Sequence, residues 1–321
     1  MTVVVTGAAG FVGNNLVHEL LAAGHSVRAV VRNDRGPLEG LNVEIFEADV
    51  WEPETLRPAF EGADLVIHTV AIISLLGDPG GIVHRTNVVG AGATARMALE
   101  CGVKRYVHVS SCHAFDLDHH PITEDSPRPG PRLPAYDRSK AGGEAAVREV
   151  IADGLSGVIV NPAGILGPRD YSPSPLGGAL VDMARRKLPA LIQGAFHWVD
   201  VRDVARGAML AAEKGEAGRG YLLSSEYLSI AQLAELVKEN TGSEPPWFTC
   251  PMWLARATGP FVDAAAKLGF KPMYTSEYLG PLRASSSMEC ARARTELGWE
   301  PRSVAESMRD LFAWRREVGL A

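Results

Sequence analysis

A glycine-rich stretch directly after the first apolar run constrains this chain more than any other feature of its sequence. The run Val3–Thr6 predicts a short buried strand, and Phe11–Ala23 carries apolar residues at helical spacing. The junction between them reads Thr-Gly-Ala-Ala-Gly-Phe-Val-Gly. Glycines at such a junction permit a tight turn and a close approach of the backbone to a ligand. The sequence therefore predicts a strand–loop–helix unit whose loop binds a ligand.

A pyrophosphate is the ligand that suits this loop. Gly7 would form the turn, Gly10 would let the backbone approach the pyrophosphate, and Gly13 would allow the helix to pack closely on the strand. The free N–H groups and the positive dipole at a helix N-terminus favour an anion. We therefore predict dinucleotide binding through Gly7, Gly10, Phe11, Val12 and Gly13.

Short apolar runs alternate with helical patterns through the first half of the chain. Continuous apolar runs are typical of strands that are buried on both faces, and this alternation predicts an α/β fold with a doubly wound parallel sheet. Ligands of such sheets bind at the carboxyl ends of the strands. The predicted strands are Val3–Thr6, Val27–Val31, Val43–Phe46, Leu65–Val70, Tyr106–Ser110 and Val158–Val160, with helices at Val83–Cys101 and Pro134–Ile151 among those between them.

The pattern changes after about residue 160, where Pro and Gly become dense over 161–178 and again over 242–260. Helical patterns dominate this part: Val201–Glu213, Ser229–Thr241, Trp253–Leu268 and Val304–Trp314. We predict a dinucleotide-binding domain over 1–160, completed by part of 195–225. Residues 161–321 are expected to form mainly a smaller, mostly helical and discontinuous substrate-binding lobe.

The end of the second predicted strand indicates which dinucleotide is bound. An acidic residue there binds the ribose 2′-OH of NAD, whereas an Arg accommodates the 2′-phosphate of NADP. Arg32 follows Val31 directly and no acidic residue precedes it, so we predict NADP; Asp34 keeps NAD open. Asp49 and Val50 end the third strand region. There the Asp carboxylate either accepts a hydrogen bond from an adenine amino group or forms a turn, and both interpretations stand.

A tyrosine and a lysine four residues apart indicate the chemistry. Tyr136 and Lys140 would share one face of a helix, about 6 Å apart along its axis. The pKa of a phenol is about 10. A nearby ammonium group, helped by a cationic nicotinamide, would lower this pKa toward neutral pH. Ser110 and Ser111 end a predicted strand on the ligand side of the sheet. We predict that Ser111, Tyr136 and Lys140 are catalytic.

With these motifs in this order, the chain resembles the extended short-chain dehydrogenase/reductase family. The resemblance rests on the glycine loop, the serine-ended strand, Tyr-Asp-Arg-Ser-Lys over 136–140 and Asp-Val-Arg-Asp-Val-Ala over 200–205. It is closest to the dihydroflavonol-reductase-like members, including the hopanoid-associated sugar epimerase-like group. The residues that carry this are Val30–Arg32, Val160–Pro162, Gly167–Asp170, and Glu296–Trp299 with Pro301.

The resemblance implies a Rossmann fold and a role for each site residue. Ser111 would hold the substrate oxygen, Tyr136 would be the acid and base, and Lys140 would bind the nicotinamide ribose and depress the Tyr136 pKa. Further cofactor contacts are implied for Thr69, Val70, Ala71, Asn87, Pro162 and Ile165. The family often carries an aromatic-Gly pair where this chain has Phe115-Asp116, and Ser111-Cys112-His113 is also unusual. These departures concern the substrate more than the cofactor. A homodimer is the assembly that the resemblance implies.

Composition and charge exclude other classes. The net charge of −6 argues against nucleic acid and membrane surfaces as partners. The four cysteines are scattered, and His113, His119 and His120 with Asp116 and Asp118 have no recognisable ligand spacing, so we interpret that loop as solvated and expect no metal. No Gly-x-Ser-x-Gly hydrolase motif occurs. Without a signal peptide at the start, the expected location is the cytoplasm.

Three functions follow from these features. The first is an NADP-dependent oxidoreductase that reduces a carbonyl, or oxidises an alcohol, of a small-molecule substrate. The second is a nucleoside-diphosphate-sugar epimerase or dehydratase with tightly bound NAD(P), because it would use the same three residues. The third is a non-catalytic cofactor-binding regulator, which the intact set of Ser111, Tyr136 and Lys140 argues against.

Overall fold

The computed structural model describes residues 1–74, 77–267, 275–280, 282 and 284–320. Its centre is a seven-stranded sheet, parallel throughout, with strand order β10-β6-β5-β4-β1-β2-β3. The chain winds outward in both directions from β1, which confirms the predicted doubly wound sheet. The strands are β1 Thr2–Thr6, β2 Ser26–Val31, β3 Glu44–Glu47, β4 Leu65–His68, β5 Arg105–Val109, β6 Gly157–Pro162 and β10 Gly220–Leu223.

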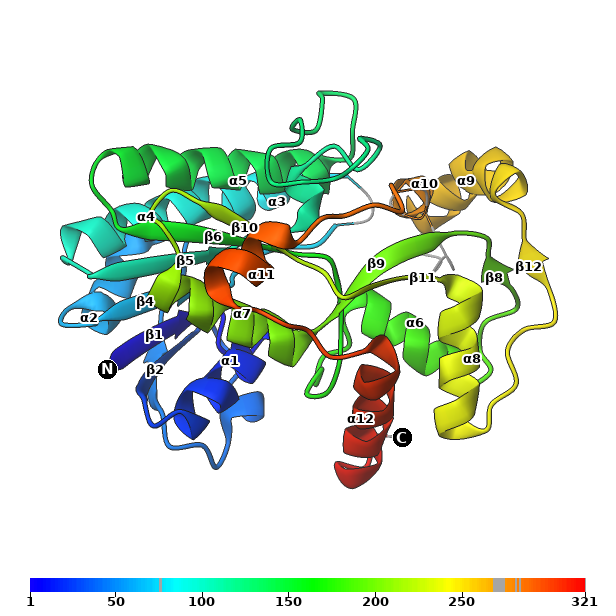
Figure 1. The fold of residues 1–321 in the computed structure, drawn as a ribbon, viewed down its shortest axis with the longest axis horizontal. Helices are drawn as coiled ribbons and strands as arrows, with labels where there is room; N and C mark the ends of the chain where they lie inside the picture. Colours follow the sequence, from blue (N-terminus) through cyan, green and yellow to red (C-terminus); the bar gives the residue numbers. More distant parts are fainter. Residues whose placement is uncertain (75–76, 268–274, 281, 283, 321) are drawn as a thin grey trace.

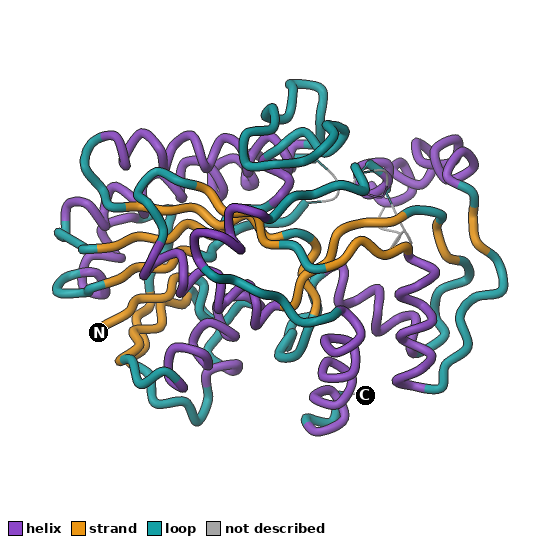
Figure 2. The backbone as a smooth tube through the Cα atoms, viewed as in Figure 1, coloured by secondary structure: helices purple, strands orange, loops and turns teal. Residues whose placement is uncertain are grey.

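Helices cover both faces of this sheet (Figures 1 and 2). On one face α1 (Phe11–Ala22) packs beside α7 (Val201–Lys214), and on the other α4 (Ala91–Glu100) packs beside α5 (Ala135–Ala152). Side chains of successive strand residues point to opposite faces of the sheet, so Val3 and Val5 belong to one apolar core and Val4 to the other. Burial of each such side chain contributes about 1.5–3 kcal/mol.

One predicted helix is interrupted. The apolar pattern over 83–101 predicted a single helix, but the structure has α3 (Ile82–His84), a π-helical segment (Arg85–Gly90) and then α4. The wider turn coincides with Asn87, whose side chain bonds to the backbone of Ile72. Short π-helical segments of this kind are frequent at functional sites.

The second half of the chain combines helices with small sheets that the sequence analysis did not predict. β7 (Gly164–Leu166), β9 (Ala195–Asp200) and β11 (Glu226–Ser229) form one, and β8 (Leu191–Ile192) pairs with β12 (Thr249–Cys250). The remaining helices in the described ranges are α2 Arg57–Phe60, α6 Pro175–Ala184, α8 Ile230–Thr241, α9 Met252–Lys267, α10 Ser276–Leu279, α11 Ala291–Leu297 and α12 Val304–Glu317. The predicted end of α9, Leu268, lies outside the described residues.

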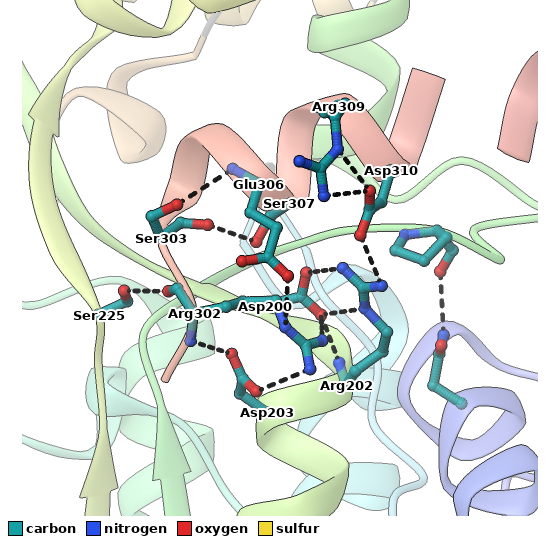
Figure 3. A network of polar contacts seen from close by, with 12 residues as sticks. Asp200, Arg202, Asp203, Ser225, Arg302, Ser303, Glu306, Ser307, Arg309 and Asp310 are labelled. Atoms are coloured by element: carbon teal, nitrogen blue, oxygen red, sulfur yellow. Dashed lines mark hydrogen bonds and ion pairs between the residues drawn. The ribbon is translucent and has the colours of Figure 1, made fainter. Parts of the chain in front are cut away.

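A buried polar network ties the start of α7 to α12 (Figure 3). Asp200 caps α7 by accepting a hydrogen bond from the backbone N–H of Arg202 (2.7 Å), and its carboxylate pairs with the guanidinium groups of Arg202 and Arg302. Asp203 accepts from the backbone N–H of Arg302 (2.8 Å), and Arg202 reaches Asp310 (2.8 Å). Asp200 is therefore the N-cap of α7.

Within the described ranges, no helix combines the length and the apolar character that a bilayer crossing requires.

Candidate active site

A cavity of about 320 Å³ opens at the carboxyl ends of the central strands, where parallel sheets bind ligands. The sheet side contributes the start of α1 and the loops after β4, β5 and β6. The opposite wall comes from α6 and β9 through Leu176, Phe196 and Trp198. The predicted site residues that line it are Gly10, Phe11, Val12, Gly13, Thr69, Ala71, Ser111, Tyr136, Lys140, Pro162 and Ile165.

The glycine loop has the tight geometry that its sequence suggests. Gly7 has a φ of +73°, in the left-handed region that favours glycine. A Cβ on Gly13 would lie 2.1 Å from the carbonyl oxygen of Gly7, so no side chain fits there. α1 begins after Gly10 with no side-chain cap, which leaves backbone N–H groups of its first turn available to a ligand. The loop therefore fits a pyrophosphate group at the helix N-terminus.

Ser111, Tyr136 and Lys140 come together in this cavity. Tyr136 and Lys140 lie one turn apart on α5, and Ser111 follows β5. Lys140 is 3% exposed and donates from Nζ to the carbonyl of Val109 (3.3 Å). Burial lowers the pKa of Lys140 to about 8, although Glu144 opposes this shift. Lys140 is thus a buried cation at the base of the cavity.

The protonation state of Tyr136 depends on its surroundings in the cavity. Burial raises the pKa of this phenol above its ordinary value, and the hydrogen bond with Ser111 is the contribution that lowers it. The depression of this pKa by Lys140, acting together with a bound cationic nicotinamide, stays a prediction. Tyr136 is therefore protonated near neutrality, which suits a group that donates a proton.

Two buried histidines lie beneath Lys140, and the sequence analysis missed both. His68 and His108 are aligned across β4 and β5, and their rings stack with centroids 5.5 Å apart. Burial, and then the charge of Lys140, lower the His68 pKa to about 3, and the His108 pKa falls well below its ordinary value. A hydrogen bond joins His68 Nδ1 to Thr6 Oγ1 (2.7 Å). Both rings are therefore neutral.

His113 and Asp137 also border the cavity. Nδ1 of His113 lies 2.7 Å from Oδ1 of Asp137, and their side chains are 16% and 11% exposed. The sequence analysis placed His113 in a solvated loop; the structure confirms exposure for His119 and His120 but not for His113. The unusual Ser-Cys-His run was the only signal in the sequence. Among the described residues, no group of three or more His, Cys, Asp or Glu side chains could hold a metal.

Six predicted cofactor residues do not line the cavity: Gly7, Arg32, Asp49, Val50, Val70 and Asn87. Arg32 is exposed at the end of β2, and no ion pair or hydrogen bond joins it to another described residue. Asp34 accepts a hydrogen bond from the N–H of Gly36 (2.9 Å) and so belongs to a turn. Asp49 accepts one from the N–H of Trp51 (2.9 Å), which is the turn-forming interpretation.

Asn87 joins the loop after β4 to α5. Its Oδ1 accepts from the N–H of Ile72 (2.8 Å), while its Nδ2 donates to the carbonyl of Ile72 (2.9 Å) and to Ser139 Oγ (2.9 Å). These bonds fix the predicted cofactor loop relative to the helix that carries Tyr136 and Lys140. The contact of Asn87 with a cofactor stays a prediction.

Comparisons with known proteins agree with this architecture. The sequence model described as the NAD dependent epimerase/dehydratase family matches residues 3–223. Sterol demethylase protein B of Methylococcus capsulatus is 34% identical, with both chains covered fully. A Synechocystis sp. protein that carries the provisional name dihydroflavonol 4-reductase is 31% identical over 98% of this chain and 94% of its own. The crystal structure of gox2253 has a TM-score of 0.87 and 32% identity, with 99% of each chain covered.

Proposed function

The chain belongs to the NAD dependent epimerase/dehydratase family, whose members are NAD(P)-dependent enzymes, and we propose that it is an NADP-dependent oxidoreductase of an apolar small molecule. It reduces a ketone of that molecule or oxidises the corresponding alcohol. The preference for this function over that of a sugar epimerase rests on the residues that line the cavity.

The cavity wall favours an apolar substrate over a nucleoside-diphosphate sugar. Leu176, Phe196 and Trp198 line the same cavity as the catalytic residues. Among the described lining residues no Arg or Glu occurs, and Lys140 and Asp137 are the only Lys and Asp. A diphosphate is bound most strongly by Arg and Lys through charge-assisted hydrogen bonds. The name of one relative, sterol demethylase protein B, refers to an apolar ring compound, which supports the same class.

The three catalytic residues divide the work at the carbonyl. Ser111 and Tyr136, which line the same cavity, both donate to the substrate oxygen, and Tyr136 gives up its proton as negative charge develops there. Lys140 stabilises the phenolate that remains and binds the ribose. The nicotinamide cofactor supplies the hydride when it is bound. Gly7, Gly10, Gly13 and the loop 69–71 would hold it, with Pro162 and Ile165 beside the nicotinamide.

The proposed function predicts reduction of apolar cyclic ketones. With NADPH, the protein should oxidise the cofactor in the presence of trans-1-decalone or 1-tetralone, which is measured by the loss of reduced-nicotinamide absorbance. UDP-glucose incubated with the protein and NAD(P) should stay unepimerised. Conversion of UDP-glucose to its C4 epimer, with neither ketone reduced, would favour the sugar epimerase instead.

Arg32 is expected to select NADPH over NADH. Its guanidinium is exposed and unpaired within the described residues, and one charge-assisted bond to a 2′-phosphate contributes about 1.5–3 kcal/mol. Arg32→Ala should therefore weaken NADPH binding about 10- to 100-fold and leave NADH binding nearly unchanged. Fluorescence titration of both cofactors measures this. Arg35→Ala is the matched control, because Arg35 pairs with Glu47 (2.6 Å). An unchanged NADPH-to-NADH ratio in Arg32→Ala would contradict the assignment.

A further inference from the structure

We propose that His113, oriented by Asp137, is a second acid–base residue of the cavity, and that it transfers a proton at the carbon next to the substrate carbonyl. The inference rests on the proposed function, since it needs a ketone held by Ser111 and Tyr136. In addition to hydride transfer, the cavity would then catalyse a redox-neutral step. That step is either exchange of the α-proton or the shift of an adjacent double bond.

The chain fixes His113 and Asp137 against the catalytic residues. His113 lies in the short 3-10 turn Cys112–Ala114, and its backbone N–H donates to Ser111 Oγ (3.2 Å) at the N-cap of that turn. Asp137 follows Tyr136 in the first turn of α5. A ligand held by Ser111 and Tyr136 is therefore beside the histidine–aspartate pair as well.

The hydrogen bond defines which ring nitrogen is the base. A carboxylate only accepts, so Nδ1 of His113 carries the proton that faces Asp137, and Nε2 is the nitrogen with a lone pair in the neutral form of the ring. Within the described part of the chain, no partner is recorded for Nε2. The ring stands edge-on to Tyr136, with centroids 5.3 Å apart, and 5.8 Å from the ring of Phe196. A histidine with one nitrogen bound to a carboxylate and the other available has the form of a general base.

The proposed step conserves atoms and electrons. Nε2 of His113 takes a proton from the α-carbon, and the pair of that C–H bond forms a C=C bond. The carbonyl π pair moves onto the oxygen, which Ser111 and Tyr136 stabilise through hydrogen bonds. Nε2 then returns a proton to the same carbon, or to the far end of a conjugated double bond. Asp137 is a positioning residue that stabilises the imidazolium. No oxidant or reductant is consumed.

Deuterium exchange tests this step separately from reduction. The full-length protein is incubated in D₂O with trans-1-decalone and NADP⁺, which carries no hydride to give, and deuterium at the α-carbons is measured by mass spectrometry. Wild type should exchange about 100-fold faster than His113→Gln, since general base catalysis contributes about 10²–10⁴. In the same variant the rate of NADPH-dependent reduction should fall by at most about 10-fold. Asp137→Asn should slow exchange and shift its pH profile.

His119→Gln is the matched control, because His119 is exposed and does not line the cavity, and it should leave both rates unchanged. Equal exchange in wild type and His113→Gln, or an equal loss of exchange and reduction, would overturn the inference. Exchange needs no hydride, so exchange in the wild type that depends on His113 supports the role of His113 as a base. This holds even when the protein reduces no ketone. Exchange without any ketone reduction would contradict the proposed reductase function and leave the role of His113 standing.

Discussion

Tyr136→Phe is expected to lower the turnover number for ketone reduction about 1,000-fold, because the substituted ring has no proton to donate to the substrate oxygen. Burial raises the pKa of this phenol, so the native residue enters the reaction protonated. Of the two proposed donors to the carbonyl oxygen, only Ser111 then remains. The affinity for NADPH should change by less than about 3-fold, since the ring and Lys140 remain.

Single-turnover kinetics with NADPH measures this loss without interference from product release. Tyr171→Phe is the control, because Tyr171 is exposed and packs on Trp314 away from the cavity. If Tyr136→Phe kept more than a tenth of the wild-type turnover, Tyr136 would not be the proton donor.

Acidification is expected to destabilise the fold through the buried histidines below Lys140. The pKa of His68 is about 3 in the folded protein against 6.5 ordinarily, so below about pH 6.5 the unfolded chain binds a proton that the folded one does not. The free energy of unfolding therefore falls as the pH drops, by about 1.4 kcal/mol for each pH unit. Between about pH 6.5 and 4.5 His68 alone should remove about 2 kcal/mol, and His108 acts in the same direction.

Urea unfolding at a series of pH values measures the slope. His68→Leu should lower stability near pH 7, because Thr6 loses its hydrogen-bond partner, but it should flatten the loss on acidification. His119→Gln, at an exposed position, should leave the slope unchanged. A slope in His68→Leu as steep as that of the wild type would show that His68 does not carry the effect.

Six of the seven strands of the central sheet could be predicted, because most of them are buried on both faces. Such strands read as apolar runs, and each is followed by a helix with a local signal. The four-residue strands Gly220–Leu223 and Glu226–Ser229 were missed, since their pairing partners lie far away in the chain. A strand that short has little periodicity, and only the completed structure defines its neighbours.

The candidate site shows the same limit. Ser111, Tyr136 and Lys140 were predicted from spacing and order along the chain, and the structure brings them into one cavity. The pair of His113 and Asp137 was not predicted. The unusual Ser111-Cys112-His113 run was its only sequence signal, and the two side chains meet only when the turn after β5 packs against the start of α5. The interruption of the helix at Asn87 was also missed, because it accompanies hydrogen bonds to a loop rather than any Pro or Gly break.

Strand β10 joins β6 only after the chain has passed through β7, α6, β8, β9 and α7. During translation, the outer edge of β6 therefore emerges with no strand beside it, although all six of its residues are buried in the finished protein. Synthesis at about 5–20 residues per second leaves that apolar edge unpaired for roughly 3–12 s, longer than many domains need to fold. Ribosome pausing between codons 162 and 223 would prolong this interval, during which the exposed edge could pair with a strand of another chain.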